Sequence, residues 1–119
     1  MIQKSSILNT SDTTGIVTVN CFHIYQKKKN FIAKFSNFIK ISTRIVFFRA
    51  KKLRKKKFKA IVILLKYKFK KPDGSNIKFL TNTCVLLKRR VIPLSDFITG
   101  CCIYNVRRKK FLSSFLISI

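Results

Sequence analysis

A large and unevenly placed excess of positive charge is the strongest constraint on how this chain can fold. The chain has 27 Lys and Arg residues against 3 Asp and no Glu, a net charge of +24 over 119 residues. Residues 1–25 contain only Lys4 and Asp12 as charged residues, so the whole excess lies in residues 26–119. Self-repulsion of this size disfavours a compact state, whereas a dense array of phosphates would neutralise it and release counterions. The charge therefore predicts a polyanionic partner.

The apolar content predicts a folded domain in spite of this charge. Hydrophobic residues make up 47% of the chain and include 12 Phe, which is too apolar for a disordered basic tail. We expect a single domain over residues 1–119. The longest apolar run, Ala60–Leu65, and the C-terminal run Phe115–Ile117 are both far shorter than the roughly 20 residues of a membrane span. Residues 1–15 also lack the pattern of a signal or transit peptide, so we expect neither a membrane span nor a targeting segment.

Short strand patterns separated by turns predict a mostly β fold. Ile16–Tyr25 alternates apolar and polar residues and changes parity near Cys21, which indicates a bulge. Pro72–Ser75 predicts a tight turn that joins Lys66–Lys70 to Ile77–Phe79 as a hairpin. We expect a turn over Asn9–Gly15 and further strands at Ile2–Leu8, Phe38–Phe48, Phe58–Leu65 and Cys84–Leu87. These elements favour a small closed or nearly closed β-barrel.

Two other segments depart from the strand pattern. Lys51–Lys57 has no sustained apolar face and predicts a solvated loop or hairpin tip. Arg107–Ile119 carries Phe111, Phe115 and Ile119 at four-residue spacing, which predicts an amphipathic helix led by a basic turn.

The residue types that enzymes use are scarce. Asp12 and Asp73 stand in turn contexts, where backbone hydrogen bonding accounts for them. The single histidine, His23, lies in a strand pattern, and the three glycines stand apart, so no phosphate-binding glycine loop is present. We therefore predict no catalytic site and no cofactor.

The four cysteines, at positions 21, 84, 101 and 102, show no CxxC spacing. In strand-like apolar surroundings, Cys21 and Cys84 are expected to be small buried hydrophobes in a reducing compartment. A zinc site at Cys21 and His23 would need a second well-spaced pair, which the sequence lacks. We predict no metal site.

Blocks of basic residues are the stronger functional signal. One block is usually a solvated face, but several blocks with almost no compensating acid favour nucleic acid. The aromatic–glycine pattern of a stacking platform is missing, so phosphate contact is favoured over base readout, and folded RNA over DNA. The residues expected to bind RNA are Lys28, Lys29, Arg44, Arg49, Lys51, Lys52, Arg54, Lys55, Lys56, Lys57, Lys59, Lys68, Lys70, Lys71, Lys88, Arg89, Arg90, Arg107, Arg108, Lys109 and Lys110.

A collinear set of residues along nearly the whole chain carries a resemblance to a known family. Its most specific stretch is Lys71-Pro72-Asp73-Gly74-Ser75, followed at the same spacing by Cys84-Val85-Leu86-Leu87. The resemblance also includes the stretches Met1-Ile2-Gln3, Phe38-Ile39-Lys40-Ile41 and Lys59-Ala60-Ile61-Val62. With these residues the chain resembles large ribosomal subunit protein fourteen in its bacterial and organellar form.

The resemblance implies a five-stranded β-barrel with a protruding basic β-hairpin and short C-terminal helices. The barrel and ribbon would occupy residues 1–92, and the C-terminal loop and helices residues 93–119. The core would be formed by Val17, Val19, Ile39, Ile41, Ile61, Ile63, Val85 and Leu87. The implied partners are large-subunit rRNA, the neighbouring large-subunit proteins nineteen and three, and small-subunit rRNA across an intersubunit bridge; we expect no homo-oligomer.

The biased composition, rich in Lys, Ile, Phe and Asn, favours a copy encoded in an organelle. Because the sequence has diverged so far from the family, a mitochondrial ribosome is favoured over a relict plastid. One alternative is a free-standing organellar nucleic-acid-binding barrel, which would need exposed aromatic rings among Phe22, Phe47, Phe48 and Phe79. A second is a peripheral protein of anionic membranes, which would use its Lys-rich loops and the Phe111–Ile119 stripe.

Overall fold

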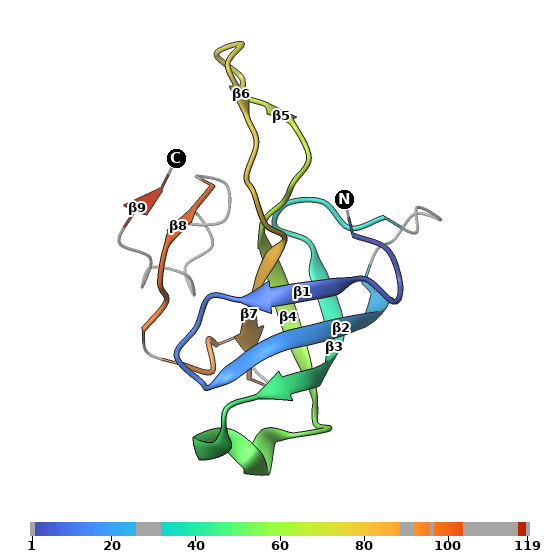
Figure 1. Ribbon diagram of the computed structural model, residues 1–119. Coiled ribbons are helices and arrows are strands. Elements are labelled where there is room, and N and C mark those ends of the chain that lie inside the picture. Colours follow the sequence, from blue (N-terminus) through green and yellow to red (C-terminus); the bar gives the residue numbers. More distant parts are fainter. Residues whose placement is uncertain (1, 26–31, 89–91, 96, 104–116, 119) are drawn as a thin grey trace.

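A closed five-stranded barrel forms the centre of the protein (Figure 1). The computed structural model describes residues 2–25, 32–88, 92–95, 97–103 and 117–118. The barrel strands are β1 (Ile7–Thr10), β2 (Ile16–Ile24), β3 (Phe38–Val46), β4 (Lys57–Leu64) and β7 (Thr83–Leu87). The other elements are the 3-10 helix η1 (Phe48–Leu53), the strands β5 (Phe69–Lys70) and β6 (Asn76–Ile77), and the strands β8 (Cys101–Cys102) and β9 (Ile117–Ser118).

Pairing between the first and last barrel strands closes the sheet. β1 is antiparallel to β2 and parallel to β7, where Asn9 pairs with Thr83 and Thr10 with Cys84. The remaining neighbours, β2 with β3, β3 with β4 and β4 with β7, are all antiparallel. Closure leaves no exposed strand edge around the barrel. The five-stranded β-barrel expected from the sequence is therefore confirmed.

All five barrel strands contribute side chains to one hydrophobic core. The fully buried side chains that the strands contribute to it are Leu8, Val19, Cys21, Ile39, Ile41, Ala60, Val62, Cys84 and Leu86. Val17, which we expected in this core, is only half-buried. The register of β2 against β3 shifts between Ile16 and Thr18, and Ile16 is the buried residue at this end of the strand.

A second buried cluster lies on the other face of β4 and β7. It contains Ile61, Ile63, Val85 and Leu87 from these strands, together with Ile98 and Cys102 from the C-terminal part. Those four strand residues were expected in the barrel core, and the structure corrects this. β4 and β7 are covered on both faces, and strands covered in this way carry continuous rather than alternating apolar sequence.

The first strand begins later than its sequence suggested. Ile2 forms an isolated bridge with Ala33, and Ser5 has a positive φ of 70°, which turns the chain before β1 starts at Ile7. Asn9 and Thr10 were expected in a turn, but they belong to β1 because they pair with β7. Both differences arise from contacts between segments far apart in the sequence.

The connection between β3 and β4 also differs from the expectation. The strand expected to reach Phe48 ends at Val46, and part of the expected Lys51–Lys57 loop lies in η1. Ala50 is buried in η1 next to Gly15, where a Cβ atom would lie 2.8 Å from the Ala50 Cβ. Gly15 thus gives this connection room to fold back against the barrel.

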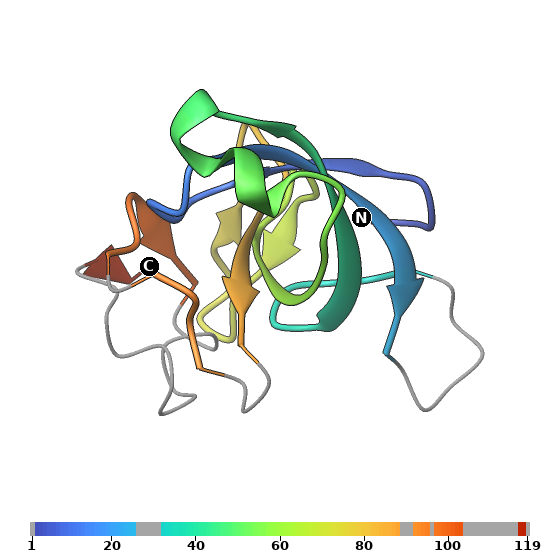
Figure 2. The same cartoon turned by 90° about the horizontal axis from the view of Figure 1, so that it is seen from below.

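Two local predictions are confirmed. The register of β2 against β3 shifts between Cys21 and His23, where a bulge was expected. β5 and β6 form the predicted hairpin, whose turn holds Gly74 at a φ of 91° and the Asp73 carboxylate accepting from the Ser75 backbone N–H at 2.9 Å. Figure 1 shows this hairpin projecting from the barrel at the end opposite η1, and Figure 2 views the molecule from the η1 end.

Most of the expected C-terminal helix lies outside the described residues. Within Arg107–Ile119, the structure describes only Ile117–Ser118, which form β9 parallel to β8. These two residues are therefore extended rather than helical. The short C-terminal helices and the division at residue 92 stay predictions.

Candidate nucleic-acid interface

A row of cations lies on the outer face of β3 and β4. Ile39, Ile41 and Ala60 are buried in the barrel, so Lys40 and Lys59, which alternate with them, belong to the opposite face. Lys40 pairs directly with Lys59, and Ser42 with Lys57. We call Lys40, Lys57 and Lys59 the cationic sheet face. Like charges in directly opposite positions destabilise a sheet, so this face is suited to an anionic partner.

Aromatic rings support the ammonium groups of this face. The Phe22 ring lies 5.9 Å from the Lys40 Nζ and 5.6 Å from the Lys57 Nζ. The Lys59 Nζ lies 4.8 Å from the Phe38 ring centre and 5.2 Å from that of Tyr25. Such cation–π contacts orient the charges without neutralising them. The face therefore keeps its positive potential in a defined arrangement.

Lys88 extends the cationic sheet face. A groove of about 420 Å³ is lined by Lys57, Lys59 and Lys88, with Phe58, Leu87 and Leu94 as its apolar lining. Three ammonium groups around one open groove are suited to contacts with phosphates, which position a protein on its nucleic acid.

A second group of cations surrounds η1. This group consists of exposed side chains, which are Arg49, Lys51, Lys52, Arg54, Lys55 and Lys56. The connection that carries them is held to β3, because the Thr43 backbone N–H donates to the Lys56 carbonyl at 3.0 Å and the Thr43 hydroxyl to the Leu53 carbonyl at 2.8 Å. These charges therefore sit on an anchored connection.

A third group lies on the projecting hairpin. Lys68 and Lys70 are exposed, and Lys71 is half-buried with its backbone N–H bonded to the Ser75 carbonyl at 2.8 Å. In Figure 1 the hairpin and η1 lie at opposite ends of the molecule. The predicted RNA-binding residues thus form separate regions rather than one patch. The predicted RNA-binding residues that lie outside the part of the chain that the structure describes are Lys28, Lys29, Arg89, Arg90, Arg107, Arg108, Lys109 and Lys110.

Both carboxylates in the described part of the chain have structural partners. The Asp12 carboxylate accepts from the Thr14 hydroxyl at 2.8 Å and from the Leu86 N–H at 3.2 Å. Burial raises the pKa of Asp12 above its ordinary value, against the opposite effect of these hydrogen bonds. The hydrogen bond from the Ser75 hydroxyl lowers the pKa of Asp73. The acids therefore serve the fold, as their turn contexts predicted.

Most of the aromatic side chains that the stacking alternative would use are exposed. The exposed fractions are 37% for Phe22, 56% for Phe47 and 90% for Phe48. Phe79 is half-buried, with its ring edge-on to Phe35 at 6.2 Å. Three of the four rings are thus exposed, so the stacking alternative keeps the aromatic surface that it needs.

The structure adds one residue that the sequence-based list of RNA-binding residues omitted. Lys40 faces outward beside Lys59, although it stands in a strand pattern rather than in a basic block. The alternation of Lys40, Ser42 and Arg44 with apolar residues was the signal for its outward position. What the sequence did not reveal was its partner on β4.

Two of the cysteines belong to the barrel core. Cys21 and Cys84 are buried, as predicted, and burial raises the pKa of both thiols. No group of three or more His, Cys, Asp or Glu side chains in these residues could hold a metal ion. No helix among them has the length and apolar character needed to cross a membrane.

Comparisons with known proteins identify the family of this chain. Residues 1–118 match the family model described as ribosomal protein L14p/L23e. The chain is 42% identical to the large ribosomal subunit protein uL14m of Tetrahymena pyriformis over 119 residues, which is 100% of each chain. Both findings confirm the resemblance drawn from the sequence. The chain belongs to the ribosomal protein L14p/L23e family, and it is a ribosomal structural protein rather than an enzyme.

Proposed function

We propose that this protein is a structural constituent of the large subunit of a mitochondrial ribosome and binds large-subunit rRNA through its Lys and Arg side chains. The observation that carries the proposal is the direct pairing of Lys40 with Lys59 on the cationic sheet face. The full-length similarity to uL14m of Tetrahymena pyriformis supports the setting. A mitochondrial ribosome is preferred to that of a relict plastid on the same ground.

The barrel acts in this role as a rigid frame for several separate phosphate contacts. The cationic sheet face, the η1 connection and the hairpin each present cations from a different part of the surface. RNA that folds around the protein would engage these regions together, mainly through phosphate and ribose groups. The logarithm of the affinity falls as salt is raised, by roughly 0.9 per tenfold increase in salt for each duplex phosphate that the protein contacts. The binding is therefore expected to be steeply salt-dependent.

The further partners come from the family resemblance. They are proteins nineteen and three of the large subunit, and small-subunit rRNA across an intersubunit bridge. The resemblance implies that these contacts come from the C-terminal region, residues 93–119, of which residues 96, 104–116 and 119 lie outside the described residues. Within the ribosome the protein would be present as a single copy.

The exposed rings of Phe47 and Phe48 favour one second candidate. A free-standing organellar nucleic-acid-binding barrel would also use exposed rings beside cations. The two functions differ in where the protein resides, because only a ribosomal constituent sediments stoichiometrically with the large subunit.

Sedimentation of a mitochondrial lysate with mass spectrometry of the fractions tests the proposal. We expect the protein in the large-subunit and monosome fractions, at a constant ratio to other large-subunit proteins, and released as salt is raised. Recovery only near the top of the gradient would contradict the ribosomal role. Flotation with liposomes of anionic lipid, without ribosomes, would instead favour the membrane alternative.

A further inference from the structure

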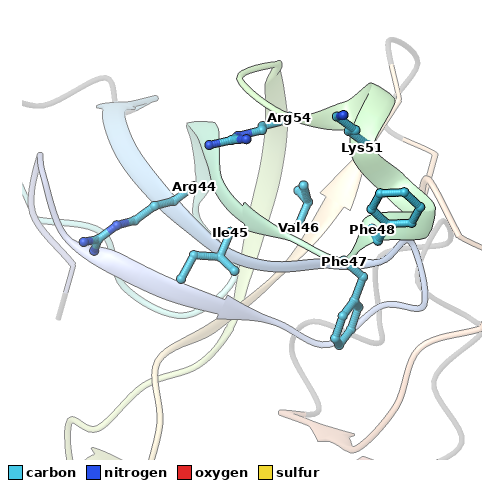
Figure 3. Close-up of a pocket in the computed structure, with 7 residues that line it drawn as sticks. All are labelled: Arg44, Ile45, Val46, Phe47, Phe48, Lys51 and Arg54. Atoms are coloured by element: carbon cyan, nitrogen blue, oxygen red, sulfur yellow. The ribbon is translucent and has the colours of Figure 1, made fainter.

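An open groove lies where β3 meets η1. It has a volume of about 390 Å³ and is lined by Arg44, Ile45, Val46, Phe47, Phe48, Lys51 and Arg54. Figure 3 shows these side chains: Val46 lies below Lys51 and Arg54, and Phe47 points away from these two cations. The groove thus combines apolar and aromatic surface with three cations.

The aromatic and apolar side chains of this groove are exposed. Phe48 is 90% exposed and Phe47 56%, and Ile45 beside them is also exposed. The Arg49 guanidinium carbon lies 5.5 Å from the Phe47 ring centre, so that ring already has a cationic neighbour. Phe48 presents the most accessible ring surface of the groove. An exposed apolar patch rimmed by polar residues marks an interaction site.

The charges of the groove select the chemistry of its occupant. Arg44, Lys51 and Arg54 line it, and neither carboxylate of the described residues does so, because Asp12 is held by Thr14 and Leu86 and Asp73 lies in the hairpin turn. A flat ring beside guanidinium and ammonium groups matches a nucleotide, whose base stacks while its phosphate pairs with the cations. An apolar segment of a neighbouring protein would use the rings but would leave three cations unpaired.

We propose that this groove holds one unpaired nucleotide of RNA, with its base stacked on Phe48 and its flanking phosphates at Lys51, Arg54 and Arg44. This inference rests on the proposed function, since it names a subsite within the proposed rRNA contact. It adds base stacking to a surface that the sequence assigned to phosphate contact alone. Stacking of this kind tolerates any base, because every base has a π-face.

Two RNA probes separate stacking from phosphate contact. One is a single-stranded 12-mer of adenosine, and the other is a 12-base-pair RNA duplex; both are titrated into the full-length protein at several salt concentrations. Phe48→Ala should weaken binding of the single strand by roughly 5- to 150-fold and leave duplex binding within a factor of two. Phe48→Tyr, which keeps a ring, should bind the single strand as the unmodified protein does.

Phe97→Ala is the matched control, because it removes another exposed phenyl ring that does not line the groove. It should change neither affinity. If Phe48→Ala bound both probes like the unmodified protein, or weakened both equally, the stacking subsite would be disproved while rRNA binding stood. If the unmodified protein bound neither probe, the proposed function itself would fail.

Ultraviolet cross-linking of purified mitochondrial large subunits tests the same subsite in place. A nucleotide adduct on the peptide that contains Phe47 and Phe48 supports it. A cross-link from this peptide only to a neighbouring protein would overturn it and make the groove a protein contact.

Discussion

Lys40 on β3 and Lys59 on β4 stand directly opposite each other in the antiparallel ladder, with both side chains on the outer face of the barrel. The backbone pairing that holds the barrel together thereby brings two like charges side by side. In the free protein this arrangement opposes stability. Against an RNA backbone the same arrangement contributes affinity, because the phosphates supply the missing negative charge.

The Lys40–Lys59 pair predicts opposite effects on stability and on RNA binding. Lys40→Glu places a carboxylate opposite Lys59, so the free protein should gain about 0.2–1 kcal/mol in unfolding free energy. Its affinity for RNA should fall, and the slope of log affinity against log salt should become shallower by at least roughly 0.7. Urea unfolding and RNA titrations measure the two effects.

Lys4→Glu is the control for this variant, since it makes the same change in net charge at an exposed position outside the barrel strands. It should not reproduce the gain in stability. The double variant Lys40→Glu with Lys59→Glu restores a like-charge pair and should lose the gain. Equal behaviour of Lys40→Glu and Lys4→Glu would show that net charge alone, rather than the pairing, governs stability.

Gly15→Ala should destabilise the barrel by more than about 1 kcal/mol. Gly15 has a φ of 89°, and the added Cβ would lie 2.8 Å from the Cβ of Ala50. Gly74→Ala carries the same backbone strain at a φ of 91°, but its Cβ would meet open space in the described structure. Its effect on thermal or urea unfolding should therefore be smaller.

The double variant Gly15→Ala with Ala50→Gly separates the two causes. Removing the Ala50 Cβ relieves the steric contact but not the backbone strain, so part of the lost stability should return. If none returned, the close approach of residues 15 and 50 would not be the reason for glycine at position 15.

Asp12 should make the stability depend on pH in a direction unusual for a carboxylate. Because burial raises the pKa of Asp12 above its ordinary value of 3.8, the native state keeps its proton at pH values where the unfolded chain has lost it. The unfolding free energy therefore falls as pH rises from about 3.8 through the raised pKa. Urea unfolding of the unmodified protein and Asp12→Asn between pH 3 and 7 should show this fall only in the former.

Asp73→Asn provides the comparison of opposite sign. The hydrogen bond that the Ser75 hydroxyl donates to the Asp73 carboxylate lowers the pKa of Asp73. As pH rises, the native state therefore loses that proton before the unfolded chain does, and stability rises with pH up to the ordinary carboxyl value. A stability difference between the unmodified protein and Asp12→Asn that rose with pH would contradict the burial of Asp12.

The cysteines should react with thiol reagents in a fixed order. Cys84 and Cys21 are buried and burial raises the pKa of both thiols, which disfavours the reactive thiolate. Cys101 is only half-buried. Alkylation of the native protein followed by peptide mass spectrometry should therefore modify Cys101 before Cys21 and Cys84. Early modification of Cys84 would show that the barrel core opens more readily than its burial implies.

Local patterns in the sequence predicted the elements whose causes are local. The alternation in residues 16–25 located β2 and its bulge, and the Pro72–Ser75 turn located the hairpin. The continuous apolar run at 58–65 predicted the strand β4, which the structure shows to be covered on both faces. Each of these features depends on side-chain period or turn chemistry within about ten residues. The scarcity of acids and the blocks of Lys and Arg likewise indicated an anionic partner before any fold was known.

What the sequence by itself determined is a small, strongly basic β-barrel of a ribosomal protein family, because strand period, turn residues and net charge are properties of neighbouring residues or of the whole composition. Only the tertiary structure decided that Lys40 lies opposite Lys59. It also decided that Ile61 and Val85 pack in the second buried cluster rather than in the barrel core. The exposed position of Phe48, in one groove with Lys51 and Arg54, is a third such feature. These relationships follow from strand register and from the way the β3–β4 connection folds back over Gly15. Both depend on the energy of contacts between segments distant in the chain, which no local pattern encodes.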